Sequence, residues 1–508
     1  LTVVLNWIDS NPRGQPPGWE PYPLSLRIVN WLKFLDRHAK RWWEMERASD
    51  TARILASLSA QVCALEGGLE KDVLTNHLLK NAKALVFAGG LLQTAGSHRW
   101  LREGLEPLKR EIQEQILEDG GHFQRSPMYH GQVLEDLLDL EILLTSWPLP
   151  AAGAESESGG EVAQLLRERV VKMSGWLQAM LHPDDEIPLM NDSALGMVSP
   201  PRELLERVGM MRTARARGHN APDAASNVPA SSGHSDVRIL DQSGYATIRH
   251  EPVRSFLVFD CGPLGPSYQP GHGHCDLLSF ELSLHGMRVV VDTGTSTYEA
   301  GPIRSHERST AAHNTLRIDG EEQAEMWSSF RVGRRPQVGR LTGAAHGNLS
   351  FVQGKYSTGA RCGVMHARAV IRDGEGGWWF VDLLEGSGEH GVESFIHFHP
   401  QVTVELVRQV NAAQAPPCNF REQAILDFGG HRYRLLGPTG TAFKLAESWY
   451  SPEFGMRVKN TVASWRWRGR IPAASAFALA PMESRIPEVR LSAERGCCWI
   501  GDFKLSLR

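Results

Sequence analysis

Two histidines, one residue apart, precede an alternating apolar run near the middle of the chain. His272 and His274 lie in QPGHGHCDLLSFELSLHGMRVVVDTGTSTY, which starts at Gln269, and Asp292 and His313 follow. In an extended segment, residues i and i+2 face the same way, so the two imidazoles would project together. Imidazoles and a carboxylate are suitable ligands for zinc or another first-row divalent ion. From the residues alone, a metal site and a set of hydrogen-bonded polar residues at a sheet rim remain equally good interpretations.

A second group of polar residues occurs in the first half of the chain. Asn76 and His77 lie in TNHLLKNAKAL, and Tyr129 follows a Gly120-Gly121 break in EDGGHFQRSPMYHGQ. An Asn-His pair is typical of a polar helix face, and a tyrosine at a helix start is typical of amphipathic packing. Taken singly, these residues therefore leave both a functional and an ordinary structural interpretation open.

Two further segments carry candidate binding residues. Trp19 and Tyr22 lie among prolines in NPRGQPPGWEPYPLSLR, where rigid aromatic rings either stack on sugar faces or, more commonly, pack against a helix rim. Asn191 and Asp192 lie in HPDDEIPLMNDSA, a predicted loop between helices that Pro183 and Pro188 hold in shape.

Two kinds of structure must position these residues. Apolar residues recur at three- and four-residue spacing from about Pro23 to Arg212, which predicts antiparallel helix hairpins. The segment Ala214 to Asp236 has no apolar period and is predicted to be a linker. The period then becomes two, and a hairpin turning at His285-Gly286 would not place His274 directly opposite Asp292. We therefore predict a helical domain over 1–213, a linker over 214–236 and an antiparallel β-sandwich over 237–508.

The composition argues against several classes of protein. The 508 residues are 42% hydrophobic and 22% charged, with a net charge of -4 that argues against a general nucleic-acid binder. No uninterrupted apolar run approaches the length that spans a bilayer. The seven cysteines are scattered and odd in number, which predicts buried free thiols, and Cys275 adjoins the histidine pair. Because the chain starts at Leu1 rather than Met, we expect that a native N-terminus is missing.

The combination and order of these motifs is more informative than any one of them. Together they resemble the heparinase II/III-like polysaccharide lyases, which include alginate lyases and glycosaminoglycan lyases. The resemblance implies an incomplete α/α toroid followed by an antiparallel β-sandwich, with the active site in the cleft between the two domains. It covers nearly the whole chain and rests on NPRGQPPGWEPYPLSLRIVNW, NHLLKNAKAL, DGGHFQRSPMYH, HPDDEIPLMNDSA, HGHCDLLSFELSLHGMRVVVDTGTSTYE, RSTAAHNTLRIDG, FRVGRR and WYSPEFG.

The resemblance also implies a reaction, the cleavage of an anionic uronate polysaccharide by β-elimination. The proton removed lies next to a carboxylate, so the site needs donors or a cation that neutralise this carboxylate. Asn76, His77 and His272 match the family positions that do so. Tyr129 matches the catalytic tyrosine. With a free pKa of about 10 it acts as an acid without tuning, and as a base only beside cations.

The family's metal ligands match His274, Asp292 and His313. The resemblance thus favours one divalent ion, zinc first with manganese or calcium as alternatives, that organises the cleft rather than acting as a Lewis acid. One departure concerns Lys80, which stands where the family often has a glutamate. Substrate-binding roles are predicted for Trp19, Tyr22, Arg125, Asn191, Tyr298, Arg304 and Arg308.

Two other functions are weighed against the lyase. A glycoside hydrolase on a toroid would need two facing carboxylates, for which Asp119 and Asp192 are available without a supporting spacing. A non-catalytic exopolysaccharide-binding or assembly protein would be expected to lack Asn76, Tyr129 or His272, and all three are present. A polymer substrate suggests a periplasmic or secreted location. The oligomeric state and the identity of the uronate polymer have no signal in the sequence.

Overall fold

The computed structural model describes residues 2–44, 48–146, 154–218, 235–358, 362–407, 420–438 and 441–508. The chain divides into two compact units. The helical unit comprises Leu1–Gly120 and Gln132–Ser174, and the sheet-rich unit comprises Gly121–Gly131 and Gly175–Arg508. The start of one long helix, including Tyr129, thus belongs to the sheet-rich unit. Most of the predicted linker, residues 219–234, lies outside the described residues.

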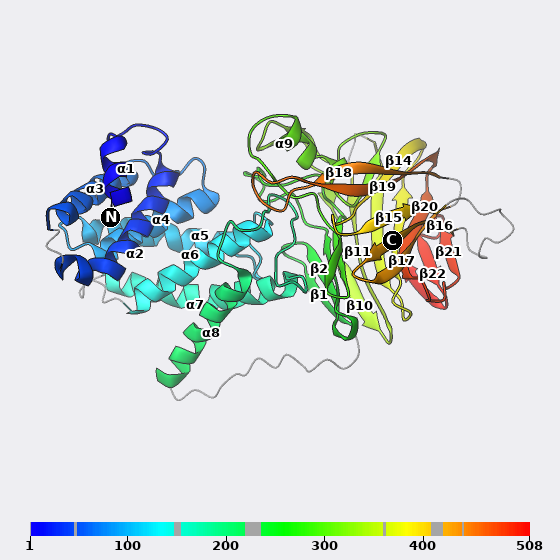
Figure 1. Ribbon diagram of the computed structural model, residues 1–508, viewed down its shortest axis with the longest axis horizontal. Coiled ribbons are helices and arrows are strands. Elements are labelled where there is room, and N and C mark those ends of the chain that lie inside the picture. Colours follow the sequence, from blue (N-terminus) through cyan, green and yellow to red (C-terminus); the bar gives the residue numbers. More distant parts are fainter. Residues whose placement is uncertain are drawn as a thin grey trace. The chain divides into compact units, whose positions relative to one another are not determined.

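The helices occupy the first part of the chain (Figure 1), as the apolar spacing predicts. In α3, for instance, the buried residues Ile54, Leu58, Val62 and Leu65 form one apolar stripe. α2 packs against both α3 and α4, and α4 packs against α5. The helices are α1 (Thr2–Ser10), α2 (Pro21–Glu44), α3 (Ala48–Glu66), α4 (Thr75–Leu91), α5 (Ser97–Gln115), α6 (Pro127–Ser146), α7 (Ala154–Met180) and α8 (Pro201–Gly218).

Glycines set the close contact between α4 and α5. A Cβ on Gly89 would lie 2.7 Å from both the Leu101 side chain and the Ser97 carbonyl oxygen. A Cβ on Gly104 would lie 2.8 Å from the Val86 side chain. Because neither position has room for a side chain, the two helices approach more closely than larger residues would permit. None of the helices in the described part of the chain is long and apolar enough to cross a membrane.

The sheet-rich unit is antiparallel in all its strand ladders among the described residues, as the period of two predicts. The first sheet has the order β1-β2-β3-β4-β5, and the four-stranded sheet has the order β18-β19-β14-β6. The largest sheet runs β10-β11-β12-β13-β20-β17-β16-β15, with β9 paired to β11. β21, β22 and β23 form a further sheet, and β7 and β8 form a short hairpin.

The strand bounds follow chain order. They are β1 (Asp236–Leu240), β2 (Tyr245–His250), β3 (Ser255–Asp260), β4 (Phe280–Leu284), β5 (Met287–Val290), β6 (Leu316–Ile318), β7 (Met326–Trp327), β8 (Arg331–Val332), β9 (Gln337–Val338), β10 (Thr342–His346), β11 (Leu349–Ser357), β12 (Met365–Arg372), β13 (Trp378–Glu385), β14 (Glu389–His397), β15 (Thr403–Leu406), β16 (Phe420–Phe428), β17 (His431–Pro438), β18 (Ala442–Tyr450), β19 (Val458–Arg470), β20 (Ala473–Pro481), β21 (Val489–Ser492), β22 (Cys497–Ile500) and β23 (Phe503–Ser506). Short helices occur at Glu251–Val253 (η1), Pro302–Glu307 (α9) and Thr310–Ala312 (η2).

A stack of aromatic rings joins three of these sheets in the core. Phe280 on β4 stacks on Phe380 of β13 at 4.1 Å, and Phe380 stacks on Phe477 of β20 at 4.6 Å. Trp465 on β19 continues the stack at 5.3 Å from Phe477. Each ring is buried, so the stack packs the three sheets together.

The segments around the histidine pair follow from this frame. The predicted hairpin turn is present: β4 and β5 are joined at His285 and Gly286, which have φ of 54° and 81°. The GHGH segment itself is not a strand, because residues 271–279 form turns and loop before β4 begins. The loop between β3 and β4 therefore presents His272 and His274, and the segments after β5 present Asp292 and His313.

Candidate active site

A buried carboxylate, Asp192, is the centre of the polar network in the sheet-rich unit. It follows α7 in the loop where it was predicted, and it is fully enclosed. Its Oδ2 lies 2.9 Å from His272 Nδ1, and its Oδ1 lies 2.8 Å from His274 Nε2. Arg304 donates to both oxygens, with a distance of 2.8 Å to Oδ2. His272 and His274 are thus brought together, as the spacing predicts, but by a shared carboxylate rather than by a strand.

The network sets the charges of its members. Burial alone would raise the pKa of Asp192, but the Arg304 charge and the hydrogen bonds of His272 and His274 hold it well below its ordinary value. Burial lowers the pKa of His274 to about 3, so this ring is neutral at physiological pH. Asp192 is therefore an anion whose oxygens are already occupied, held in place by the Arg304 guanidinium.

Tyr129 lies at the start of α6 and its ring contacts His272. Its ring centroid is 4.2 Å from that of His272, with an interplanar angle of 40°. Its hydroxyl lies 3.1 Å from the Tyr298 hydroxyl. Burial raises the pKa of Tyr129 and the Asp192 charge raises it further, while Tyr298 and Arg304 act in the opposite direction. The phenol is therefore protonated at neutral pH, as a proton donor must be.

Strained backbone surrounds this network. Arg125, Asn191, Leu278 and Ser328 are not glycines, yet their φ values are 59°, 56°, 61° and 59°. Such conformations cost free energy and persist only where the surrounding contacts hold them, commonly at functional sites. Asn191 shows these contacts, since its side chain accepts from the His274 N–H at 3.1 Å and donates to the Arg125 carbonyl at 3.2 Å.

This geometry changes the expected roles of three predicted binding residues. Arg304 and Arg308 are both buried. Arg304 binds Asp192 and also donates to the Ser329 carbonyl. Arg308 donates to the carbonyls of Gly273, Ser328 and Ser329. Asn191 is buried and is engaged as described above. In this arrangement these side chains hold the histidine loop, and direct contact with a polysaccharide would require breaking those bonds; their substrate-binding roles stay predictions.

Other predicted binding residues remain at the surface. Tyr298 is half-buried, with its ring 5.0 Å from the Arg304 guanidinium carbon. Arg125 is also half-buried and donates to the carbonyls of Phe123 and Ser243 at 2.7 and 3.1 Å. Trp19, in the helical unit, donates its Nε1 to the Asn11 carbonyl at 3.2 Å and is half-buried. Their substrate-binding roles stay predictions.

A second polar cluster lies in the helical unit, at the start of α4. His77 Nδ1 lies 2.9 Å from Glu70 Oε1, and the His77 ring lies 4.4 Å from that of Tyr22. Asn76 is buried next to it. The residues just before, Leu74 and Thr75, have φ of 60° and 57°, which is unusual for a β-branched residue such as threonine. The Asn-His pair is therefore held by a strained turn rather than by an ordinary helix start.

Lys80, where the family often has a glutamate, points into the helix packing. Its Nζ lies 2.6 Å from Asp136 Oδ2 on α6, and Lys83 bridges Asp136 and Asp139 at 2.9 and 2.6 Å. All four side chains are buried. The Asp136 carboxylate thus compensates the Lys80 charge locally.

The predicted metal ligands are all enclosed in the sheet-rich unit. Asp292 Oδ2 and His313 Nδ1 are 2.7 Å apart, and the rings of His274 and His313 are 5.3 Å apart between centroids. His274 Nδ1 and His313 Nε2 have no hydrogen-bond partner, although both atoms are buried. Two such nitrogens and a carboxylate fit the donor chemistry of zinc. Among the described residues, however, no three His, Cys, Asp or Glu side chains are gathered around one point.

Two carboxylates that orient the catalytic candidates have no direct signal in the sequence. Glu70 and Asp192 each bind the Nδ1 atom of a histidine, His77 and His272 respectively. The sequence places Asp192 in a loop but does not indicate its hydrogen-bond partners, because they lie 80 and more positions away. Cys275, which adjoins the histidine pair, is fully buried, and burial raises the pKa of its thiol to about 12. It is an inert core residue.

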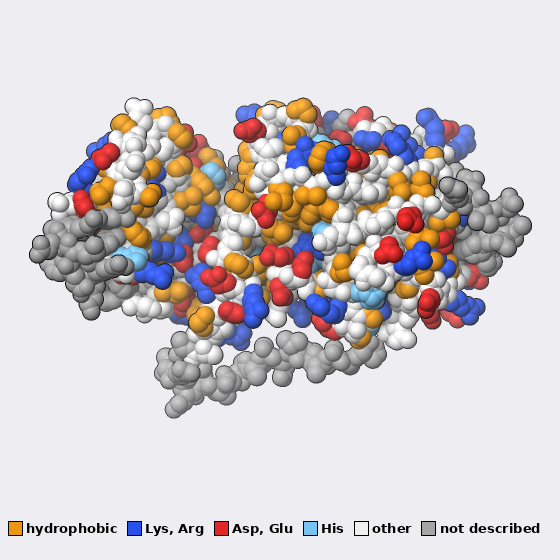
Figure 2. Space-filling view, viewed as in Figure 1, with side chains coloured by type: hydrophobic (Ala, Val, Ile, Leu, Met, Phe, Trp, Pro, Cys, Tyr) orange, Lys and Arg blue, Asp and Glu red, His pale blue; other side chains and the backbone are white. Residues whose placement is uncertain are grey.

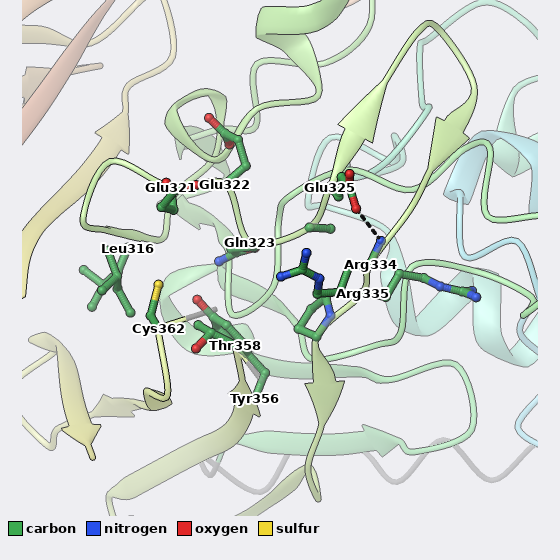
Figure 3. A pocket seen from close by; sticks show the side chains of 13 residues that line it. Leu316, Glu321, Glu322, Gln323, Glu325, Arg334, Arg335, Tyr356, Thr358 and Cys362 are labelled. Carbon is green, nitrogen blue, oxygen red and sulfur yellow. Dashed lines mark hydrogen bonds between the residues drawn. The ribbon is translucent and has the colours of Figure 1, made fainter. Parts of the chain in front are cut away.

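A separate pocket in the sheet-rich unit carries mixed charges (Figure 3). Glu321, Glu322, Glu325, Arg334 and Arg335 line it, together with Tyr356, Thr358 and Cys362. The backbone N–H of Arg334 donates to Glu325 Oε2 at 3.2 Å, which joins the two ends of the β7–β8 hairpin. None of the residues predicted for catalysis or metal binding is among those that line this pocket.

Comparison with known proteins identifies the family. Residues 233–484 match the family described as heparinase II/III-like, C-terminal, and residues 65–205 match the heparinase II/III N-terminus. Together the two matches cover most of the chain. The chain therefore belongs to the heparinase II/III-like family, as its motifs predict.

Solved structures of similar fold support this assignment. A crystal structure of heparinase III matches with a TM-score of 0.73 at 16% identity, covering 99% of this chain and 78% of that one. A heparan sulfate lyase structure from Pedobacter heparinus matches with a TM-score of 0.64 at 18% identity, covering 99% and 77%. The predicted fold class, an incomplete α/α toroid followed by an antiparallel β-sandwich, is thereby confirmed.

Curated relatives carry the name heparin-sulfate lyase. One from Bacteroides thetaiotaomicron is 23% identical over 359 residues, which are 63% of this chain and 47% of the relative. One from Pedobacter heparinus is 23% identical over 298 residues, 55% of this chain and 43% of the relative. One from Bacteroides stercoris is 21% identical over 439 residues, which are 82% of this chain and 59% of the relative. The matched regions thus span about half the length of these relatives.

Proposed function

We propose that this protein is a polysaccharide lyase that cleaves uronate-containing glycosaminoglycans by β-elimination and leaves an unsaturated uronate end. The observation that carries the proposal is the contact of Tyr129 with His272, whose Nδ1 is bound to the buried Asp192 carboxylate. Family membership and relatives named heparin-sulfate lyase support it. Heparan-type chains are therefore the first substrates to test, and alginate is the second.

The difficult step is removal of a proton next to the uronate carboxylate. Negative charge develops there beside charge already present, so the carboxylate must be stabilised by donors. We assign this role to Asn76 and His77, following the family positions. The bond from Glu70 to His77 Nδ1 leaves Nε2 as the nitrogen for a substrate. The buried Asn76 amide and the strained turn before it support a positioned donor rather than a mobile one.

The two proton transfers are assigned to His272 and Tyr129. Because His272 Nδ1 is directed at the Asp192 anion, its proton resides there, and Nε2 is the atom that accepts the substrate proton. Tyr129, whose pKa burial raises, donates to the leaving glycosidic oxygen. Tyr298, 3.1 Å from the Tyr129 hydroxyl, orients that phenol.

We also propose that His274, Asp292 and His313 hold one divalent ion, zinc first. When bound, such an ion would fix the loop that carries His272 and would supply positive charge near it. The two unpartnered nitrogens of His274 and His313 support this assignment. Elemental analysis of purified protein would test it: wild type should carry about one ion per chain, and a His313→Ala variant should carry none.

The glycoside hydrolase alternative is not favoured. That mechanism needs two carboxyl groups at the scissile bond, one of them free to lose or gain a proton. Asp192 is enclosed and is held as an anion by Arg304 and two histidines, so it cannot take either role.

The test is an ultraviolet assay for the unsaturated uronate product on heparan sulfate, heparin, chondroitin, hyaluronan and alginate. Wild type should raise the absorbance on at least one polymer, and Tyr129→Phe should lower the rate by a factor of about 10² to 10⁴. Reducing ends without absorbance would establish hydrolysis instead. Binding of a polymer with no new ends of either kind would establish a binding protein.

A substrate with an activated leaving group separates the roles of Tyr129. A synthetic uronide that carries an aryloxide at C4 expels its leaving group without an acid. Tyr129→Phe should therefore retain most of the wild-type rate on this compound while losing the rate on polymer. Loss of both rates would show that Tyr129 is the base, which would contradict the assignment to His272.

The remaining proposal concerns location. Since polymeric uronate polysaccharides are encountered outside the cytoplasm, we propose that the native protein is periplasmic or secreted. Fractionation of the native host with an antibody against this chain would test the proposal, and recovery in the cytoplasmic fraction would contradict it.

A further inference from the structure

A hollow with an arginine-rich rim lies on the outer face of the four-stranded sheet, in a part of the chain that the proposed mechanism does not use. Arg317, Glu393, Arg466, Trp467 and Arg468 line it, together with Asp319, Gly320, Gly391 and Val392. The residues come from β6, β14 and β19 and from the turn after β6. Figure 2 shows Lys and Arg side chains gathered on the part of the surface where Figure 1 places β14, β18 and β19.

The strand register explains why arginines gather there. In the sequence WRWRGR, Trp465 is buried and Trp467 is half-buried, whereas Arg466, Arg468 and Arg470 alternate with them along β19 and are exposed. Cross-strand pairing places Arg466 opposite Glu393, Arg468 opposite Gly391 and Arg470 opposite Glu389. β6 places Arg317 on the other side of Glu393. Residues that pair directly share a face, so these side chains form one continuous strip.

The acidic residues in the strip are already engaged. Arg317 and Arg466 both bind the Glu393 carboxylate, and Arg468 Nε lies 2.7 Å from Glu389 Oε1. Asp319 accepts from the Gly391 N–H at 2.9 Å and lies 2.7 Å from His390 Nδ1. A guanidinium has five N–H donors, so a single carboxylate leaves donors on Arg466 and Arg468 for another anion. Lys444, on the same face of β18, adds a further exposed cation.

Gly391 is the residue that makes the hollow, and neither packing nor backbone conformation requires a glycine there. A Cβ at this position would meet only Asp319 Oδ1, at an ordinary 3.9 Å. Its φ is not among the positive values. Glycine inside a strand weakens the sheet, and an extended position of this kind favours a β-branched residue. The open space beside Arg466 and Arg468 is therefore the feature that glycine provides.

We propose that this hollow binds a sulfate or carboxylate group of an anionic polysaccharide, as a surface subsite separate from Tyr129 and His272. Arg317, Arg466 and Arg468 would surround the anion, and the absence of a side chain at Gly391 would admit it. The choice of a polysaccharide, rather than another polyanion, rests on the function proposed above. A long chain held at a second point dissociates more slowly than one held only at the active site, so the subsite would favour long polymers over short ones.

The experiment measures the Kd of the full chain for long heparan sulfate, in a Tyr129→Phe background that prevents cleavage. Gly391→Val fills the hollow without changing charge, and Arg468→Gln removes one donor. Each should raise the Kd about threefold to tenfold. Gly469→Ala, whose Cβ would only touch Trp467 at 3.6 Å, and Arg490→Gln, on the separate β21–β23 sheet, serve as matched controls that should leave the Kd unchanged.

Each outcome separates this subsite from the proposed function. An unchanged Kd in Gly391→Val, with wild type still cleaving the polymer, would overturn the subsite and leave the lyase. A Kd raised by Gly391→Val, with no cleavage by wild type, would support the subsite and contradict the lyase. Equal effects of Arg490→Gln and Arg468→Gln on the Kd would show that any surface arginine contributes to binding, which would overturn a specific subsite in the strip. Duplex DNA that binds as tightly and responds to the same variants would overturn the assignment to polysaccharide.

Discussion

The catalytic candidates share one local design, a histidine whose Nδ1 is held by a carboxylate. For His272 that carboxylate is Asp192, which also binds His274 and Arg304. Asp192→Asn should lower kcat on the polymer by about 10² to 10⁴, because the neutral amide no longer holds the imidazole proton at Nδ1. The KM should change little, since Asp192 is enclosed and does not reach the substrate.

A second buried triad provides the control for this substitution. Asp382 is bound by Arg368 Nε at 2.7 Å and by His366 Nε2 at 2.7 Å, the same residue types as around Asp192. Asp382→Asn should lower the stability of the sheet-rich unit, as breaking a buried ion pair does, while kcat stays at the wild-type value. Comparable losses of kcat in both variants would contradict a positioning role for Asp192.

At the residue scale, the sequence identifies residues better than it identifies their roles. The types and spacing of His272, His274 and Tyr129 leave an ordinary structural interpretation open, and it is the resemblance of the whole ordered set of motifs to the family that selects them. The partners do not follow from spacing, since Asp192 and Arg304 are 112 positions apart. An arginine in a polar loop is ordinarily expected at the surface, and only the folded chain shows that Arg304 and Arg308 are buried.

Among the elements, α4 and α5 are in close contact because their glycines leave no room for a side chain. Gly104→Ala should lower the free energy of unfolding of the helical unit by about 1–3 kcal/mol. The reason is that its Cβ would lie 2.8 Å from the Val86 side chain and 2.9 Å from the Ala82 carbonyl oxygen, so the helices must separate. Urea unfolding followed by circular dichroism at a helix wavelength would measure the change.

Gly160→Ala is the matched control on α7. A Cβ there meets no atom within 4 Å, so alanine gains helix propensity without a clash. It should raise the free energy of unfolding by about 0.5–1 kcal/mol. The two substitutions are chemically identical and differ only in surroundings, so equal effects would show that α4 and α5 are not in close contact.

The elements also show where periodicity predicts structure and where it does not. The turn at His285-Gly286 is predictable because a two-residue hairpin connection needs two positive φ values between alternating strands. The GHGH segment resembles a strand by spacing but forms a loop, because its glycines and Pro270 interrupt the ladder before Phe280. Contacts to Asn191 and Asp192 then hold the loop in this conformation.

At the scale of the whole molecule, buried neutral histidines make stability depend on pH. His182 and His366 are fully buried, and burial lowers the pKa of each. Burial also lowers the pKa of His397, to about 3. In the unfolded chain their pKa is about 6.5, so above that pH they contribute nothing. As the pH falls below 6.5, the unfolded state binds protons that the folded state does not, and the free energy of unfolding falls.

Each of these histidines therefore lowers the free energy of unfolding as the pH falls from 6.5 to 5, and for His397 the slope approaches about 1.4 kcal/mol per pH unit. Asp276, whose pKa burial raises to about 6, acts in the opposite direction in this window, so the test compares variants that differ by one histidine. The paired carboxylates Asp139 and Asp382, with pKa values of about 2, lose their contribution only below pH 3.8 and fall outside this window. Urea unfolding at a series of pH values, with EDTA present throughout, would measure the slope. His397→Gln retains a donor for the Ala311 carbonyl and removes one titrating ring. It should therefore reduce the slope of the unfolding free energy against pH by the contribution of about one proton, about 1.4 kcal/mol per pH unit. An unchanged slope would mean that His397 accepts its proton in the folded state.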